Sequence, residues 1–441
     1  MGLFSVFIGL FLLTISIIIY RKGPLHPVVF FFVMWTTVCA FSAFQKKMFA
    51  ASDETYDLII IMLICVFIGS LAYFFPALRL RNSDSDLEYS YENVSGNSKK
   101  TPLLLAYILL IIYVGISLID SYIIVKNYLQ GTELWVMRGW RMSTFGVDSN
   151  PLVDRQSFAE VIFRATILYP LQNLVAPISA YLFFNKSLRL KYKNFLFLAA
   201  FSFLLTIVAT GGSRNTIVYY FGCFILYYLL SGEKSSHVKQ QIKKTGTNFF
   251  VTSFILVVAI ALVLFVTNAR TNLSVWDSVS SYLGVAPTLL TIHLPEIQQI
   301  PPTYGMLSFF GLITYPMRFL QQIGLESVIP TTYFTAFQQV LNAQSFYVVS
   351  ATGLVRNAYV TPIFYFLIDG GVPFLVVASL GFGAVLGRFS KNFFKKVTLK
   401  KFTYYSLVMQ AILFSFVQVP TVQPSFVFSI LLAWVLLGEK K

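Results

Sequence analysis

Charge is scarce in this chain of 441 residues: Asp, Glu, Lys and Arg together make up 12% of it. Apolar residues account for 56%, and aromatic residues alone for 17%. Soluble globular domains carry about 25% charged residues, so this composition excludes an ordinary soluble fold. It is typical of an integral membrane protein.

Cysteine and histidine are also rare, with three residues of each. Cys39, Cys65 and Cys223 all lie in apolar stretches, where a thiol packs as a small hydrophobic group rather than forming a disulfide. No Cys cluster, His-x-x-x-His or Asp-x-Asp occurs in the segments expected outside the membrane. We therefore expect no bound metal and no other cofactor.

Acidic residues are fewer than basic ones, 18 against 33, which gives a formal charge of +15. Such a balance invites a nucleic-acid interpretation, but its distribution argues against one. When the lysine-rich loops are placed in the cytoplasm, those loops carry 22 basic and 6 acidic residues, and the outer side carries 11 and 12. The excess is then the ordinary orientation signal, which also attracts anionic lipid. We expect a lipid bilayer, and no nucleic acid, as partner.

Apolar runs of about 20 residues, the length that crosses a bilayer, recur along the whole chain. The pattern predicts an all-α, polytopic helical bundle that forms a single transmembrane domain over residues 1–441, with the N-terminus outside and the C-terminus in the cytoplasm. Tyr359 to Ile368 is too short to cross alone, so it is either re-entrant or the outer part of a helix kinked at Gly370-Gly371. The eleven expected spans are Gly2 to Tyr20, Val28 to Phe44, Asp57 to Ala77, Leu103 to Val125, Val161 to Phe184, Phe195 to Thr210, Thr216 to Leu230, Phe249 to Val266, Val372 to Leu386, Phe402 to Val419 and Phe426 to Leu437.

Three stretches differ from the spans. Residues 81–101 are rich in Ser, Asn, Asp and Glu and predict a flexible cytoplasmic linker, so Asp84-Ser85-Asp86 within them is interpreted as solvated acid rather than a metal motif. Residues 127–160 form an outer loop whose tryptophans favour the membrane surface, either as a binding element or as an interfacial helix without chemistry. Residues 269–357 form a large outer loop, whose recurring apolar patches predict half-buried interfacial helices.

Lysine and arginine are sorted to opposite sides on this threading. The cytoplasmic side holds 17 of 20 lysines, whereas 8 of 13 arginines lie on or near the outer face. Outer arginine opposes the orientation signal, and its planar fork of donors suits phosphate and pyrophosphate oxygens. We therefore expect an outer site that handles a lipid-linked phosphate. The outer arginines are Arg138, Arg141, Arg155, Arg164, Arg214, Arg270, Arg318 and Arg356.

The sharpest local signal is Gly211-Gly212-Ser213-Arg214-Asn215, between one span and the next. Its glycines let backbone amides turn toward an anion, a helix N-terminus follows at Asn215 or Thr216, and Arg214 adds a full charge. The alternative is a tight turn whose arginine reaches the headgroups. Arg270, at the same depth, either joins this site or complements the end of its own helix.

Two further groups are candidates. Arg356, Asn357 and Tyr359 open the short apolar piece that ends in Asp369, which is either catalytic or a structural partner of an arginine. His293 is the only histidine expected outside, so it is either a general base or a packed side chain.

These residues resemble a family, the bacterial oligosaccharide repeat-unit polymerases of O-antigen, enterobacterial common antigen and capsule synthesis (Wzy type). The resemblance lies in Thr210-Gly211-Gly212-Ser213-Arg214-Asn215 opening a span, in Asn357-Ala358-Tyr359-Val360-Thr361 running to Tyr365, and in Asp369-Gly370-Gly371. The family's usual Asp-Phe-Gly has Gly370 in place of Phe here. The order of spans and the long late outer loop are similar too.

The resemblance implies an enzyme of the bacterial inner membrane that joins undecaprenyl-diphosphate-linked repeat units on the outer face. It also implies work alongside a chain-length regulator and a flippase. Arg214 and Arg270, with either Arg356 or Arg318, would stabilise the diphosphate leaving group. Arg138 and Arg141 would hold the acceptor's diphosphate, and Arg318 is also a candidate for substrate binding. Related O-antigen ligases use a His of the large outer loop, for which His293 is the candidate. The alternatives are such a ligase and a flippase for the same lipid.

Overall fold

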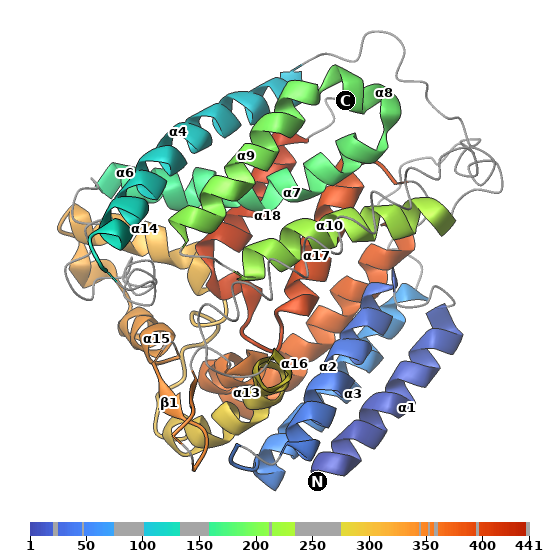
Figure 1. Ribbon diagram of the computed structural model, residues 1–441. Coiled ribbons are helices and arrows are strands. Elements are labelled where there is room, and N and C mark those ends of the chain that lie inside the picture. Colours follow the sequence, from blue (N-terminus) through green and yellow to red (C-terminus); the bar gives the residue numbers. More distant parts are fainter. Residues whose placement is uncertain are drawn as a thin grey trace.

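The structure is a computed structural model, which describes residues 1–20, 25–45, 48–74, 101–132, 158–210, 214–233, 275–343, 345–351, 353–356, 360–393 and 397–437. These residues are mostly helical, and the one sheet within them is a two-stranded antiparallel pair (Figure 1). The prediction of an all-α fold is therefore confirmed. Residues 81–100 of the predicted linker, most of the loop 127–160 and the predicted span Phe249 to Val266 lie outside the described residues, and Thr101 is already helical.

The helices before the large loop are α1 (Gly2–Tyr20), α2 (Pro27–Phe44), α3 (Asp53–Ser70), η2 (Leu71–Tyr73), α4 (Thr101–Leu129), α6 (Phe158–Phe163), the π-helical turn η4 (Arg164–Leu168), α7 (Tyr169–Phe184), α8 (Lys186–Lys191), α9 (Lys193–Ala209) and α10 (Arg214–Glu233). The large loop contributes α13 (Val275–Ile297), α14 (Phe310–Gln322), η5 (Glu326–Val328), α15 (Thr331–Asn342), β1 (Tyr347–Val348) and β2 (Val355–Arg356). The chain then forms α16 (Thr361–Phe393), α17 (Leu399–Leu413), η6 (Pro420–Val422) and α18 (Pro424–Leu436).

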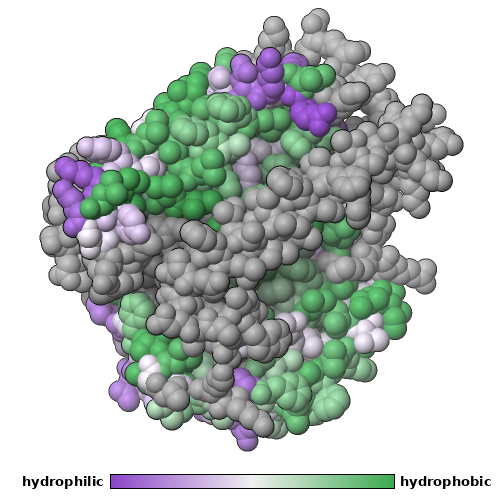
Figure 2. Space-filling view, in the orientation of Figure 1, coloured by the Kyte–Doolittle hydropathy of each residue, from purple (hydrophilic) through white to green (hydrophobic). Residues whose placement is uncertain are grey.

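Within the described residues, six helical segments are long and apolar enough to cross a bilayer, and α9, α10 and α18 are shorter apolar helices. Figure 2 shows a broad apolar band over α4 and α9, with hydrophilic side chains at either end of it. The chain is therefore a multi-pass membrane protein. The six segments are Gly2–Tyr20, Pro27–Phe44, Asp53–Tyr73, Leu103–Leu129, Phe158–Phe184 and Thr361–Ser390.

The tightest helix crossing joins α3 to α16 through glycine. A Cβ on Gly69 would lie 2.1 Å from the carbonyl oxygen of Leu380, and a Cβ on Gly383 would lie 2.1 Å from that of Val66. Gly387 meets the Ser70 carbonyl in the same way, at 2.3 Å. Small residues let helix backbones approach closely, and in a bilayer this packing replaces the hydrophobic driving force. The crossing fixes α16 in the bundle.

Helix α16 begins with the short apolar piece that the sequence left open. It passes through Gly370 (φ 179°, ψ 30°) and Gly371 (φ 68°, ψ −160°), which are not helical, and continues to Phe393. The positive φ of Gly371 is a conformation that a side chain would disfavour. The structure therefore shows the second of the two expected arrangements: the short apolar piece is the first part of a helix that is interrupted at Gly370-Gly371 and then continues.

Residues 275–356 cover one end of this bundle, and we call their described elements the cap (Figure 1). Helix α13 packs against α2, α3 and α16. Thr288 Oγ1 donates a hydrogen bond to the Phe49 carbonyl, and the Phe49 N–H donates one to the Val349 carbonyl. The cap is thereby joined to the turn between α2 and α3.

Candidate functional site

The cap is held to the break in α16 by Asp369, which is 0% exposed. Its carboxylate accepts hydrogen bonds from Thr303 Oγ1 at 2.5 Å and from the backbone N–H groups of Gly305, Leu307 and Ser308 at 3.0, 3.1 and 2.9 Å. Four donors converge on one buried charge, which replaces the hydration lost on burial. In the structure Asp369 is therefore the anchor of the turn that leads into α14.

Tyr304 in that turn has φ 52°, a left-handed conformation uncommon for a residue with a side chain. Its N–H donates to the carbonyl oxygen of Asp369 at 2.9 Å. On the far side of the turn, Thr421 Oγ1 donates to the Ser308 carbonyl at 2.6 Å. The start of α14 is thus tied both to α16 and to η6.

A cavity of about 470 Å³ opens between the cap and the start of α6. Its volume falls in the range of about 300–1,000 Å³ that is usual for small-molecule sites. Gln322, Glu326 and Phe334 at its rim are exposed. The lining residues are Phe158, Arg318, Gln321, Gln322, Glu326, Tyr333, Phe334 and Phe337.

Stacked aromatic rings form the floor of the cavity. Tyr333 is 2% exposed and lies against Phe310, with ring centroids 5.8 Å apart and planes 12° apart. Phe337 extends the stack at 6.5 Å from Tyr333. The guanidinium carbon of Arg318 lies over the Phe337 ring, 5.8 Å from its centroid, so the ring holds the guanidinium group in place. Arg318, predicted to bind substrate, does line a cavity.

Helical spacing places the polar groups of the cavity on one side of α14. Arg318, Gln321 and Gln322 stand at positions i, i+3 and i+4, which share one helix face. Glu326 follows in η5, and Phe334 and Phe337 are three apart on α15. Of these lining residues, only Arg318 was predicted from the sequence. The spacing of the two glutamines from Arg318 was the signal that could have found them.

Arg356 ends β2 and reaches α13. Its Nη2 donates to Ser281 Oγ at 2.9 Å, and its guanidinium carbon lies 5.6 Å from the centre of the Tyr282 ring. These contacts join the β1–β2 pair to α13. The neighbouring candidates Asn357 and Tyr359 lie outside the described residues.

His293 is 1% exposed, between Tyr347 and Phe364, whose ring centroids lie 4.6 and 5.1 Å away. Its Nδ1 lies 3.5 Å from a carboxylate oxygen of Glu296, while its Nε2 is buried without a hydrogen-bond partner. Burial lowers the pKa of His293, and the charge of Glu296 opposes that shift. The ring is therefore neutral at pH 7, and it is buried between β1 of the cap and α16.

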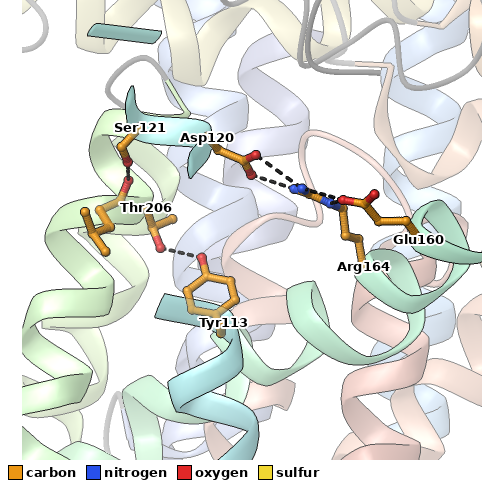
Figure 3. A network of polar contacts seen from close by, with 7 residues as sticks. Tyr113, Asp120, Ser121, Glu160, Arg164 and Thr206 are labelled. Atoms are coloured by element: carbon orange, nitrogen blue, oxygen red, sulfur yellow. Dashed lines mark hydrogen bonds and ion pairs between the residues drawn. The ribbon is translucent and has the colours of Figure 1, made fainter. Parts of the chain in front are cut away.

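Arg164 forms a buried ion cluster that the sequence did not predict (Figure 3). It contacts both carboxylate oxygens of Asp120, at 2.6 and 3.2 Å, and Glu160 at 2.8 Å. Asp120 and Ser121 are neighbours on α4, and Ser121 in turn bonds to the Leu205 carbonyl of α9. Because two carboxylates surround one guanidinium group, Arg164 is an internal tie among helices rather than an open phosphate ligand.

The remaining predicted residues are only partly described. Helix α10 begins at Arg214, so Asn215 is its second residue, and Asn215 is exposed. The side chain of Arg214 is not described, and Gly212, Ser213, Arg138, Arg141 and Arg270 lie outside the described residues altogether. The expected convergence of Arg214, Arg270 and Arg356 therefore stays a prediction. Among the residues that the structure describes, no three His, Cys, Asp or Glu side chains are grouped as metal ligands would be.

Comparison of the chain with family models, with curated proteins and with solved structures gave no match.

Proposed function

We propose that this chain is a membrane glycosyltransferase that joins undecaprenyl-diphosphate-linked oligosaccharide repeat units into a polysaccharide. It crosses the bacterial plasma membrane about eleven times, with its N-terminus outside and its C-terminus in the cytoplasm. The cap lies on the outer face. It needs no metal for catalysis.

One observation carries this proposal: an open cavity with polar and aromatic walls, placed where the cap meets a bundle that contains helices long enough to cross a membrane. A lipid-linked saccharide needs both surroundings at once, because its prenyl chain stays in the bilayer while its sugars stay in water. The family resemblance of the Gly211–Asn215 and Asp369–Gly371 segments supports the same substrate class.

In the proposed reaction, the growing glycan on one undecaprenyl diphosphate is the donor. A hydroxyl group of the incoming lipid-linked repeat unit attacks the donor's anomeric carbon. The new C–O bond forms as the bond to the diphosphate oxygen breaks, and the hydroxyl proton is released. Negative charge grows on the leaving diphosphate during this step, so fixed cations stabilise the transition state more than the ground state. Arg214, Arg270 and Arg356 supply that charge, and Arg138 and Arg141 hold the acceptor's diphosphate.

A single-substrate assay separates this function from its two rivals. The full chain is reconstituted in liposomes with one purified undecaprenyl-diphosphate-linked repeat unit and no other acceptor. A polymerase gives a ladder of products, a ligase gives none, and a flippase moves the intact lipid across the bilayer. A ladder supports the proposal, and translocation without product overturns it.

A further inference from the structure

We infer that the cavity between α14, η5, α15 and α6 binds the saccharide part of the lipid-linked substrate, and not its diphosphate. This inference rests on the proposed function for the identity of the saccharide. It gives Arg318 a different role from the outer arginines that face the leaving group. The charge, the hydrogen-bonding groups and the shape of the cavity all favour a saccharide.

The charge of the cavity does not suit a diphosphate. Arg318 is the one basic residue in the lining, and Glu326 lines the same space. A carboxylate beside a diphosphate repels it, and the pair leaves the cavity with a net charge near zero. A diphosphate bound directly by side chains is instead met by several guanidinium, ammonium or backbone N–H donors.

The hydrogen-bonding groups do suit sugar hydroxyls, each of which both donates and accepts. The Gln321 and Gln322 amides offer both functions, Glu326 only accepts, and Arg318 only donates. The hydroxyl groups of a sugar can bond to both the donors and the acceptors of the cavity, whereas an anion can bond only to the donors. Arg318 is already positioned over Phe337, so little side-chain freedom is lost when a ligand binds.

The apolar walls suit the flat, carbon-rich faces of pyranose rings. Tyr333 and Phe337 form a stacked floor, while Phe334 is 42% exposed at the rim. The cavity has a volume of about 470 Å³ and an open side, which fits a short oligosaccharide that continues outward. A polymer of repeat units needs such an opening.

The test uses the full chain in nanodiscs and two probes. One probe is the free oligosaccharide released by mild acid from the lipid-linked repeat unit, and the other is undecaprenyl diphosphate without sugar. Affinities are measured by calorimetric titration for the native chain and for Glu326→Gln, Gln322→Ala and Phe334→Ala. Gln338→Ala, an exposed amide on α15 outside the cavity, is the matched control.

A saccharide site predicts that Gln322→Ala and Phe334→Ala bind the oligosaccharide about tenfold more weakly or worse, as expected when a hydrogen bond or a stacking contact is lost. Glu326→Gln keeps a hydrogen-bonding group at its position, so its loss of oligosaccharide affinity is smaller. Binding of undecaprenyl diphosphate and the Gln338→Ala values stay unchanged. The Glu326→Gln result is decisive, because removing a carboxylate tightens diphosphate binding if the cavity is a phosphate site. That tightening, or unchanged oligosaccharide binding in all three variants, overturns the inference.

The two proposals fail separately. Oligosaccharide binding at this cavity without ladder formation removes the polymerase function and keeps the saccharide site. Ladder formation at the native rate by all three cavity variants, with native affinity for the oligosaccharide, removes the saccharide site and keeps the polymerase.

Discussion

The backbone N–H of Ser308 donates a 2.9 Å hydrogen bond to Oδ2 of Asp369, which stands 61 residues later in the chain. The other carboxylate oxygen, Oδ1, accepts from Thr303, Gly305 and Leu307. One side chain at a helix break thereby holds the start of the cap. This relationship gives Asp369 a positioning role, and it makes the position sensitive to a change of a single atom.

Asp369→Asn tests that role. An amide places an NH₂ group against either Ser308 N–H or the three donors to Oδ1, so at least one buried donor loses its acceptor, at a cost of about 1–3 kcal/mol. Asp369→Ala leaves all four donors unsatisfied and is expected to destabilise the cap further. The measurement is limited proteolysis and hydrogen exchange of residues 303–309. Asp53→Asn, at a carboxylate whose side chain is 78% exposed, is the control and should match the native chain. Native protection of 303–309 in Asp369→Ala would contradict the anchor.

The glycine crossing of α3 and α16 predicts a contrast between two neighbouring positions. Gly383→Ala places a methyl group 2.1 Å from the Val66 carbonyl oxygen, so the helices must separate, and overpacking of this kind costs about 1–3 kcal/mol or more. Gly381→Ala, two residues earlier in the same helix, has open space around its Cβ and should leave stability unchanged or raised. Thermal unfolding in detergent measures both. Equal melting temperatures for Gly383→Ala and Gly381→Ala would show that α3 and α16 have room for a methyl group at the crossing.

In the cluster of Arg164, Asp120 and Glu160, substitutions of the three residues are expected to lower the stability of the protein by different amounts. Arg164→Ala leaves two carboxylates facing each other and is expected to cost about 3–5 kcal/mol. Glu160→Gln should cost less than Asp120→Asn, because the Glu160 side chain is 37% exposed and that of Asp120 is 18% exposed. The double variant Arg164→Met, Asp120→Leu should recover much of the Arg164→Ala loss. If the double variant is no more stable than Arg164→Ala, apolar packing cannot replace the ion pair in joining the helices.

The buried histidine makes the stability of the cap depend on pH. Burial lowers the pKa of His293 below its unfolded value of about 6.5, so the unfolded chain takes up a proton first as pH falls. The stability contributed by the neutral ring is therefore present above about pH 6.5 and is lost progressively as the pH falls below it. Hydrogen exchange of residues 288–297 between pH 7.5 and 5.5 measures this loss. His293→Phe should flatten the profile, and an equally steep profile in that variant would place the titrating group elsewhere.

Much of the bundle could be predicted from hydropathy, because a membrane span is a local property of the sequence. The prediction for Gly2 to Tyr20 matches α1, and Val28 to Phe44 differs from α2 by one residue. The count of eleven is not confirmed, because six helical segments of the described residues are long and apolar enough to cross a bilayer. Some bounds differ as well: α17 ends at Leu413 rather than Val419. A hydrophobic run shows that a segment prefers apolar surroundings, but it does not show where a helix is broken or turned.

The site was less predictable because its contacts join distant parts of the chain. Nothing near Asp369 in the sequence indicates that its partners lie between Thr303 and Ser308. Likewise, Asp120 and Arg164 are 44 residues apart, and neither α4 nor η4 by itself indicates the pair. Arg318 was predicted only from the distribution of arginine between the two sides of the membrane. That distribution identifies a cation, but it does not show that Glu326 lines the same cavity.

The central claim is tested most directly by the product ladder of the reconstituted chain with one lipid-linked repeat unit. The native chain is expected to give a ladder. Arg214→Ala or Arg270→Ala should lower the turnover about 10²–10³-fold, as expected when one donor to the transition state is lost. Arg189→Ala, which removes an arginine from the lysine-rich helix α8, is the control and should keep native turnover. No ladder from the native chain, or native turnover from both outer arginine variants at normal expression, would contradict the account.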